Sequence, residues 1–273
     1  MAKKLLNGKE LAGFIKQRQA KQVRMLRQAH EIIPKLVIIQ GEKASDVIST
    51  YVRMKQRYAS DILIETEVVS MPQTELPDYI DKANRDSTVH GIVLQLPLDE
   101  PSQTESIVNL IAPEKDVDGL GERAHFISAT AEAIDWLLSG YGIELAGKKI
   151  SLLGRGKLVG RPLEKLWKAR GYNLKVLDRS STDIDATLDD SQVIVSATGV
   201  ARILNNQNVP QGITVVDAGT VSEDGKIVGD AADELQVRRD LTITPPKGGV
   251  GPLTIVLMFD HVIQAALSQI SDN

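Results

Sequence analysis

A chain of 273 residues, 42% of them hydrophobic and 25% charged, has the size and composition of a soluble protein with one large or two medium domains. Its net charge of −4 leaves no basic excess to meet phosphates, which argues against nucleic acid or a membrane surface as a partner. The absence of cysteine excludes disulfides, thiolate catalysis and cysteine-based zinc sites, and it suits a reducing cytoplasm.

The first part of the chain alternates between predicted helices and strands. Asn7 and Glu10 have capping-box spacing, so a helix should follow to about Arg27. After it we expect strand 35–39, loop 41–45, helix 47–62, strand 64–69, helix 76–85, strand 92–95 and helix 105–111. This alternation implies a parallel sheet that is covered on both faces. The N-terminus lacks the apolar core of a signal peptide, and no apolar run approaches membrane-spanning length.

The second part of the chain repeats the alternation after Asp118 and Gly119. We expect a helix over 130–139 that bridges two domains, and a helix from Pro162 to about Ala169. The other predicted elements are strands 148–153, 174–177, 192–196, 213–216 and 241–244 and a last helix over 253–270. The pattern indicates a second α/β unit of nucleotide-binding type, and the broad apolar face of the last helix requires burial.

Tyr51 and Lys55 are the first candidate site residues. At positions i and i+4 of a helix they project from one face. A partly desolvated lysine has a lowered pKa and can transfer protons, whereas the plain alternative is a solvated lysine on an amphipathic helix. Tyr-x-x-x-Lys also marks short-chain dehydrogenases, but there the glycine loop precedes the tyrosine, and here it follows by about a hundred residues.

Gln95 and Asp118 are the second candidate pair. Gln95 lies where the strand over 92–95 runs out, since Pro97 cannot donate to a ladder. Ligands of open α/β sheets bind at the carboxyl ends of strands, where an amide and a carboxylate can recognise the edge of a heterocycle. The alternative is a surface glutamine and a loop-capping aspartate.

A glycine loop, Gly154-Arg155-Gly156-Lys157-Leu158-Val159-Gly160, follows strand 148–153. Glycine allows close approach of the backbone to a phosphate at a helix N-terminus, although an ordinary turn has the same composition. The next strand ends at Asp178, near the position expected for a ribose-binding acid. An acid favours the free 2′-hydroxyl of NAD, whereas Arg179 and Ser180 favour the 2′-phosphate of NADP.

A second glycine-rich stretch, Pro245-Pro246-Lys247-Gly248-Gly249-Val250-Gly251-Pro252, comes directly before the last helix. Three glycines in four positions require unusual backbone geometry. The stretch is either a structural hinge or a loop that closes over ligands.

Taken together, these motifs resemble one family. The stretches that carry the resemblance stand in its order and spacing over nearly the whole chain, and they are Tyr51-Val52-Arg53-Met54-Lys55, Gln95-Leu96-Pro97-Leu98, Lys115-Asp116-Val117-Asp118-Gly119, Val228-Gly229-Asp230 and Gly248-Gly249-Val250-Gly251-Pro252-Leu253-Thr254. The family is that of the bifunctional methylenetetrahydrofolate dehydrogenase/methenyltetrahydrofolate cyclohydrolases, known as FolD. Each motif alone is weak to moderate, and all of them in order are highly specific.

The resemblance implies a small α/β catalytic domain, a Rossmann-like NAD(P)-binding domain and a cleft between them. We expect residues 1–120 with 254–273 to form the first domain and 121–253 the second. The implied reactions are oxidation of methylenetetrahydrofolate by NADP and hydrolysis of the methenyl product to 10-formyltetrahydrofolate, as in one-carbon metabolism and purine biosynthesis. A cytoplasmic homodimer that acts on tetrahydrofolate derivatives, with no metal, is also implied, and NAD in place of NADP stays open.

Site residues carry over from the family position by position. The resemblance implies that Lys55, Gln95 and Tyr51 are catalytic residues. Gln95 is expected to modulate the protonation of Lys55, and Tyr51 is expected to pack on the ring of the folate. Substrate binding is implied for Asp118, Gly251 and Pro252 as well. For the cofactor, the implied residues are Gly154, Arg155, Gly156, Arg179, Ser180, Thr198 and Gly199.

The chain departs from the family pattern in four places. The segment between Gly119 and Thr130 has only ten residues and lacks the usual Pro-Cys-Thr-Pro. Gly156 replaces a serine, Pro245-Pro246-Lys247 replaces Pro-Val-Pro, and Ser45 lies farther upstream of Tyr51 than usual. These changes bear on substrate affinity and cofactor choice more than on the chemistry. Two alternatives are a different two-domain dehydrogenase, resembling shikimate dehydrogenase, and a folate- or nucleotide-binding relic without turnover.

Overall fold

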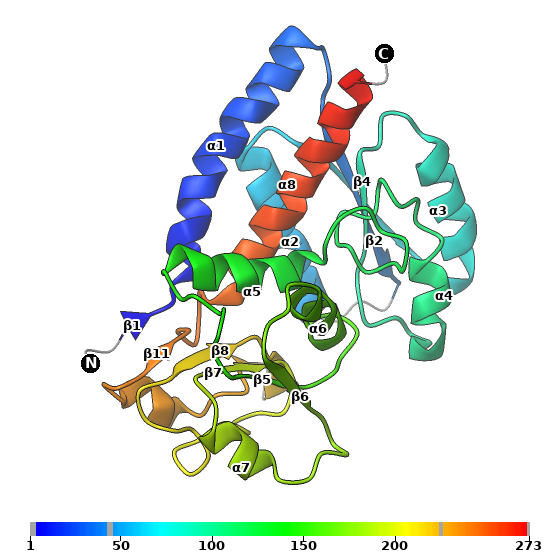
Figure 1. Cartoon of the computed structure of the whole chain (residues 1–273). Coiled ribbons are helices and arrows are strands. Elements are labelled where there is room, and N and C mark those ends of the chain that lie inside the picture. Colours follow the sequence, from blue (N-terminus) through cyan, green and yellow to red (C-terminus); the bar gives the residue numbers. More distant parts are fainter. Residues whose placement is uncertain (1–3, 43–45, 224–225, 272–273) are drawn as a thin grey trace. The chain divides into compact units, whose positions relative to one another are not determined.

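The computed structural model describes residues 4–42, 46–223 and 226–271, and it divides into two compact units (Figure 1). The six-stranded unit comprises Met1–Ala12 and Thr130–Thr254, and the three-stranded unit comprises Gly13–Ala129 and Ile255–Asn273. This division differs at the N-terminus from the expected first domain, residues 1–120 with 254–273. The first residues belong to the six-stranded unit because β1 (Lys4–Leu5) pairs in parallel with β11 (Thr242–Ile243).

The three-stranded unit is built around β2 (Lys35–Gly41), which pairs in parallel with β3 (Glu65–Met71) and β4 (Gly91–Leu94). Side chains alternate between the two faces of a strand, so Leu36 and Ile38 enter one apolar cluster while Val37 and Ile39 enter another. The first cluster includes residues of α1 (Gly8–Ala29), α2 (Asp46–Asp61) and α8 (Val250–Ser271). The second includes residues of α3 (Leu76–Arg85) and α4 (Thr104–Val108), which are preceded by the short helices η1 (Gln73–Glu75) and η2 (Pro101–Gln103).

The six-stranded unit has the strand order β1-β11-β8-β7-β5-β6, and every pairing is parallel. Its central strands are β5 (Ile150–Leu153), β6 (Leu174–Leu177), β7 (Val193–Ser196) and β8 (Thr214–Asp217). The other elements are α5 (Ala129–Gly140), α6 (Gly160–Ala169), α7 (Ile184–Asp189), η3 (Asp233–Val237) and a separate antiparallel pair, β9 (Val221–Glu223) and β10 (Lys226–Val228). The predicted α/β architecture is confirmed.

Most predicted elements occur within two residues of their predicted ends, and helix 76–85 and strand 174–177 have the predicted bounds. The helix predicted over 105–111 ends at Val108, and the last helix begins at Val250, so Gly251 and Pro252 lie in its first turn. The prediction missed β1, α7, β9 and β10, which are all short. Ser45, at the end of the expected loop, lies outside the described residues.

Helix α8 corrects the expectation that no apolar stretch approaches membrane-spanning length. Val250–Ile270 is long and apolar enough to cross a membrane by length and composition, but 67% of this stretch is buried inside the protein. Asp260 and His261 interrupt the apolar sequence, so a search for uninterrupted apolar runs does not detect this helix. Burial of this kind is expected for the core helix of a soluble protein.

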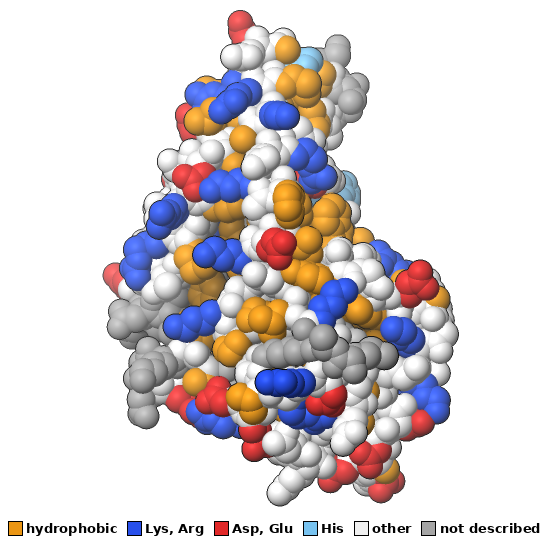
Figure 2. Space-filling view, turned by 90° about the vertical axis from the view of Figure 1, so that its left-hand side faces the viewer, with side chains coloured by type: hydrophobic (Ala, Val, Ile, Leu, Met, Phe, Trp, Pro, Cys, Tyr) orange, Lys and Arg blue, Asp and Glu red, His pale blue; other side chains and the backbone are white. Residues whose placement is uncertain are grey.

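Helix α1 presents a basic surface although the whole chain is acidic. It carries six Lys and Arg residues against a single Glu. Figure 2 looks onto the side that carries this helix and shows blue side chains spread among orange ones. The helix also exposes two large apolar side chains, Phe14 and Met25. Two of the cations are paired within the three-stranded unit, Lys16 with Asp61 and Arg18 with Asp260.

Candidate active site

Lys55 and Gln95 meet in the three-stranded unit. Lys55 is half-buried in the third turn of α2, and Gln95 is the buried residue directly after β4. The Lys55 Nζ donates a hydrogen bond to Gln95 Oε1 at 2.9 Å. The backbone N–H of Gln95 donates a hydrogen bond to the Ile39 carbonyl at 2.7 Å, which fixes the residue at the end of the sheet. The predicted pairing of the helix lysine with the strand-end amide is thus present.

Asp118 adds a negative charge to this pair without contacting Lys55 directly. Burial lowers the pKa of Lys55 below its ordinary value, and the charge of Asp118 opposes that shift. Burial likewise raises the pKa of Asp118, and the charges of Lys55 and His261 oppose it. Among the residues that the structure describes, no ion pair within 4.0 Å joins Lys55 to Asp118. Burial and the charge of Asp118 thus act on the pKa of Lys55 in opposite directions.

Asp116 organises the turn that carries Asp118. Its carboxylate accepts hydrogen bonds from the backbone N–H groups of Gly119 (3.0 Å) and Gly121 (2.7 Å). Burial raises the pKa of Asp116 to about 6, while these backbone donors favour the charged form. Gly119 has φ of 68° and lies against the Ile127 backbone, so no side chain fits there. Sequence reasoning recognised this motif but gave no role to Asp116.

His261 is a residue of this region that sequence reasoning missed. It is buried on α8, and its Nδ1 donates to the Val117 carbonyl at 2.8 Å, one residue before Asp118. Its ring stacks on Phe126 with centroids 4.7 Å apart and an interplanar angle of 17°. Phe126 belongs to the shortened segment, which therefore packs against α8. The one available signal was a histidine within an apolar helical stretch.

Tyr51 lies one turn before Lys55 on α2, as predicted, and is half-buried. Gly251 and Pro252 belong to the six-stranded unit, where the preceding glycines are tied to the start of α1. Gly248 has φ of 86°, and its carbonyl accepts the Lys9 N–H at 3.0 Å. A Cβ on Gly8 would lie 1.9 Å from the Gly249 carbonyl oxygen, so the two backbones pack without side chains between them.

The glycine loop between β5 and α6 needs two of its three glycines for steric reasons. Gly154 has φ of 93°, and a Cβ there would lie 2.4 Å from the Ala197 carbonyl oxygen. A Cβ on Gly160 would lie 2.1 Å from the Gly154 carbonyl oxygen, so α6 starts in contact with the turn. Gly156 has open space around its Cβ position. A close turn before a helix N-terminus is how parallel sheets receive the pyrophosphate of a dinucleotide.

These distances predict opposite outcomes for two glycine substitutions. Gly160→Ala should destabilise the fold by about 2 kcal/mol or more, because the methyl group collides with backbone atoms. Gly156→Ala should change the free energy of unfolding by less than about 0.5 kcal/mol, because its surroundings are open. Urea unfolding of both variants measures the difference, and equal stabilities would contradict this account of the loop.

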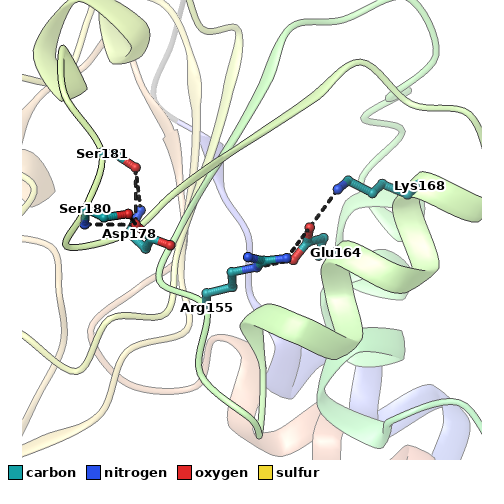
Figure 3. A network of polar contacts seen from close by, with 6 residues as sticks. All are labelled: Arg155, Glu164, Lys168, Asp178, Ser180 and Ser181. Carbon is teal, nitrogen blue, oxygen red and sulfur yellow. Dashed lines mark hydrogen bonds and ion pairs between the residues drawn. The ribbon is translucent and has the colours of Figure 1, made fainter.

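Two polar groups follow β5 and β6, which are neighbours in the sheet (Figure 3). The Arg155 guanidinium donates to both carboxylate oxygens of Glu164 on α6, at 2.8 and 3.2 Å, and Lys168 donates to the same carboxylate at 2.7 Å. Asp178 Oδ1 accepts the N–H and the hydroxyl of Ser180 at 2.9 and 2.6 Å. Arg179, beside Ser180, is exposed. Arg155 and Ser180 thus follow neighbouring strands of the sheet, and each is held by a carboxylate.

Thr198 and Gly199 follow β7, the next strand of the same sheet. The Thr198 N–H and hydroxyl both donate to Asp230 Oδ2, at 2.7 and 2.8 Å, and Ser196 donates to that oxygen at 2.6 Å. Asp230 is fully buried, and its other carboxylate oxygen has no hydrogen-bond partner among the described residues. The turn at Thr198 and Gly199, which is predicted to bind the cofactor, is therefore held in place by hydrogen bonds to the buried carboxylate of Asp230.

The strand ends of the six-stranded unit fit a dinucleotide. A parallel sheet with a tight glycine turn, a helix N-terminus and polar residues after three neighbouring strands defines the class of dinucleotide-binding α/β proteins. No group of three or more His, Asp or Glu residues that could hold a metal ion occurs in the described parts of the chain.

Comparison with known proteins identifies the family. The profile described as "Tetrahydrofolate dehydrogenase/cyclohydrolase, catalytic domain" matches residues 6–118, and "Tetrahydrofolate dehydrogenase/cyclohydrolase, NAD(P)-binding domain" matches residues 128–270. The chain belongs to the tetrahydrofolate dehydrogenase/cyclohydrolase family. These matches decide against the shikimate-dehydrogenase-like alternative.

Individual relatives span the whole chain. The bifunctional protein FolD of Macrococcus caseolyticus is 34% identical over 280 residues, which cover 97% of this chain and 98% of that protein. The crystal structure of the bifunctional enzyme FolD from Campylobacter jejuni matches with a TM-score of 0.91 at 30% identity and covers 98% and 100% of the two chains. A Trypanosoma brucei enzyme of the same kind, complexed with NADP and an inhibitor, matches with a TM-score of 0.91 at 26% identity and covers 99% of each chain.

Proposed function

We propose that this chain oxidises methylenetetrahydrofolate with NADP and hydrolyses the methenyl product to 10-formyltetrahydrofolate. The observation that carries the proposal is the half-buried Lys55, held by Gln95 and influenced by the charge of Asp118. The family profiles that match both parts of the chain support it.

In the hydrolytic step, a water oxygen bonds to the methenyl carbon and one of the two carbon–nitrogen bonds breaks. Lys55 as a neutral amine accepts a proton from the attacking water and returns one to the departing ring nitrogen, and one proton is released overall. Gln95 keeps the amine of Lys55 in position by accepting a hydrogen bond from it. Because the Gln95 side chain is neutral, it does not fix Lys55 in its charged form. Asp118 limits how far burial lowers the pKa of Lys55 and is also proposed to bind the pterin.

The oxidation step requires alignment more than proton transfer. When bound, NADP supplies the hydride acceptor for the methylene carbon. Gly154, Gly156, Arg155, Arg179, Ser180, Thr198 and Gly199 are proposed to bind it. Tyr51, Gly251 and Pro252 are proposed to orient the folate so that two carbon atoms meet. The NADP in the complex of the Trypanosoma brucei enzyme supports this choice of cofactor.

The family resemblance also supports a homodimer in the cytoplasm, which we include in the proposal. Its test is the molecular mass in solution, measured by light scattering coupled to gel filtration. A monomer at micromolar concentration would contradict the dimer without affecting the proposed reactions.

The first test is direct. Purified protein is mixed with methylenetetrahydrofolate and either NADP or NAD, and the absorbance of methenyltetrahydrofolate is followed. We expect the signal with NADP, and faster decay of added methenyltetrahydrofolate than in buffer. If neither cofactor gives a signal and added methenyltetrahydrofolate decays at the buffer rate, while folate still binds, the chain is a binding relic and the proposal fails.

A further inference from the structure

The cofactor-binding end of the six-stranded unit contains two carboxylates in addition to the cations expected there. Glu164 lies on α6, and Asp178 directly follows β6. Because β5 and β6 are paired, with Leu153 opposite Leu177, the residues that follow them are neighbours. Figure 3 shows Arg155 between the two carboxylates, with its guanidinium turned toward Glu164.

Glu164 holds the guanidinium of Arg155 in a two-bonded ion pair. The side chain of Glu164 is only 9% exposed, so its charge is poorly screened, and Arg155 and Lys168 approach it from opposite sides. These cations lower the pKa of Glu164, so the carboxylate is ionised at neutral pH. A planar guanidinium binds a carboxylate and a phosphate through the same fork of N–H groups, so Glu164 and a cofactor phosphate compete for Arg155.

Asp178 occupies the position at which dinucleotide-binding sheets carry the acid for a ribose hydroxyl. Its Oδ1 accepts from Ser180 and Ser181, whereas its Oδ2 has no hydrogen-bond partner among the described residues. Ser180 lowers the pKa of this carboxylate. In Figure 3 the second oxygen points away from the serines, toward Arg155. An ionised carboxylate accepts a hydrogen bond from a 2′-hydroxyl group and repels a 2′-phosphate.

We propose that Glu164 and Asp178 weaken the preference of this chain for NADP, so that it binds NAD with comparable affinity. This inference rests on the proposed function and deepens it. Asp178 acts by direct contact with the ribose of the cofactor. Glu164 is a positioning residue, because it acts through Arg155.

The two carboxylates have distinguishable effects on binding. Glu164→Gln removes the charge that holds Arg155, so the affinity for a 2′-phosphate should rise about tenfold while that for a 2′-hydroxyl changes little. Asp178→Asn replaces an acceptor oxygen by a donor group, so the affinity for the 2′-phosphate should rise while that for the 2′-hydroxyl falls, each by about tenfold. Loss of structure would weaken both.

The test uses calorimetric titration of the full chain with 2′,5′-ADP and with 5′-AMP, which differ by the 2′-phosphate and need no catalysis. We expect the wild-type chain to bind the two within about tenfold of each other, and each variant to shift the ratio toward 2′,5′-ADP. Glu144→Gln removes an exposed negative charge of the same unit and serves as the matched control, with an unchanged ratio expected. Thermal melting verifies that each variant is folded.

The outcomes separate the two proposals. If both nucleotides bind and neither variant shifts their ratio, the role of Glu164 and Asp178 is wrong while the dinucleotide site stands. If the wild type already binds 2′,5′-ADP more than a hundredfold tighter than 5′-AMP, the inference is also overturned. If neither nucleotide binds to the wild type, the proposed cofactor site fails, and this inference fails with it.

Discussion

Replacing Lys55 with methionine is expected to lower the rate of methenyltetrahydrofolate hydrolysis by about a thousandfold, within the range that a positioned acid–base group supplies. Methionine keeps the length and the apolar stem of the side chain, so α2 should remain packed. It has no proton to exchange and no hydrogen to donate to Gln95. Hydrolysis is followed as loss of methenyltetrahydrofolate absorbance, and folate binding by calorimetric titration should change only a few-fold.

Two further variants separate proton transfer from charge. Lys55→Arg keeps the positive charge in a group that does not lose its proton at accessible pH, and we expect it to be as inactive as the methionine variant. Lys82→Met makes the same substitution at an exposed lysine of α3 and should retain full activity. Retention of hydrolysis in Lys55→Arg would show that Lys55 acts through its charge alone, and the proposed proton transfer would be wrong.

Replacing Asp118 with asparagine is expected to shift the pH dependence of hydrolysis toward lower pH. The charge of Asp118 raises the pKa of Lys55 against the lowering effect of burial, so its removal lets that pKa fall further. The activity rises with pH as Lys55 becomes a neutral amine, and this rising limb of the pH–rate profile should therefore lie at lower pH in the variant. The height of kcat/KM should fall about tenfold to a hundredfold, because the proposed contact of Asp118 with the pterin is lost as well.

The position of the limb is the informative quantity here. Asp99→Asn removes an exposed carboxylate four residues after Gln95 and should leave both the position and the height unchanged. If the limb of the Asp118 variant stays in place or moves to higher pH, Lys55 is not the group that the profile reports.

The places of Lys55 and Gln95 could each be predicted from local rules, whereas their association was implied only by the family resemblance. Lys55 projects from a helix whose apolar face is visible in the sequence, and Gln95 ends a short apolar strand before a proline. In a parallel sheet, such strand ends face ligands. The same rules located Asp118 and the glycine turn at Gly154.

Other features depended on contacts between distant parts of the chain. His261 meets Val117 across 144 positions, and no helical or strand period encodes that contact. Arg155 was expected at a phosphate, but α6 begins at Gly160 and so presents Glu164 to it. The two-residue strand β1 is too short for any periodic signal, and its role is set by the exposed edge of β11.

The pairing of β1 with β11 also has a consequence for synthesis. Lys4 lies opposite Thr242, so the ribosome must extend the chain as far as β11 before β1 can find its partner. Closing a loop of that length carries a large entropic penalty, and such contacts form late in folding. The sheet can therefore assemble from its inner strands outward during translation, and the N-terminal segment docks as one of the last events. A nascent chain halted before residue 242 should accordingly leave that segment open to proteolysis, whereas a chain extended past β11 should protect it.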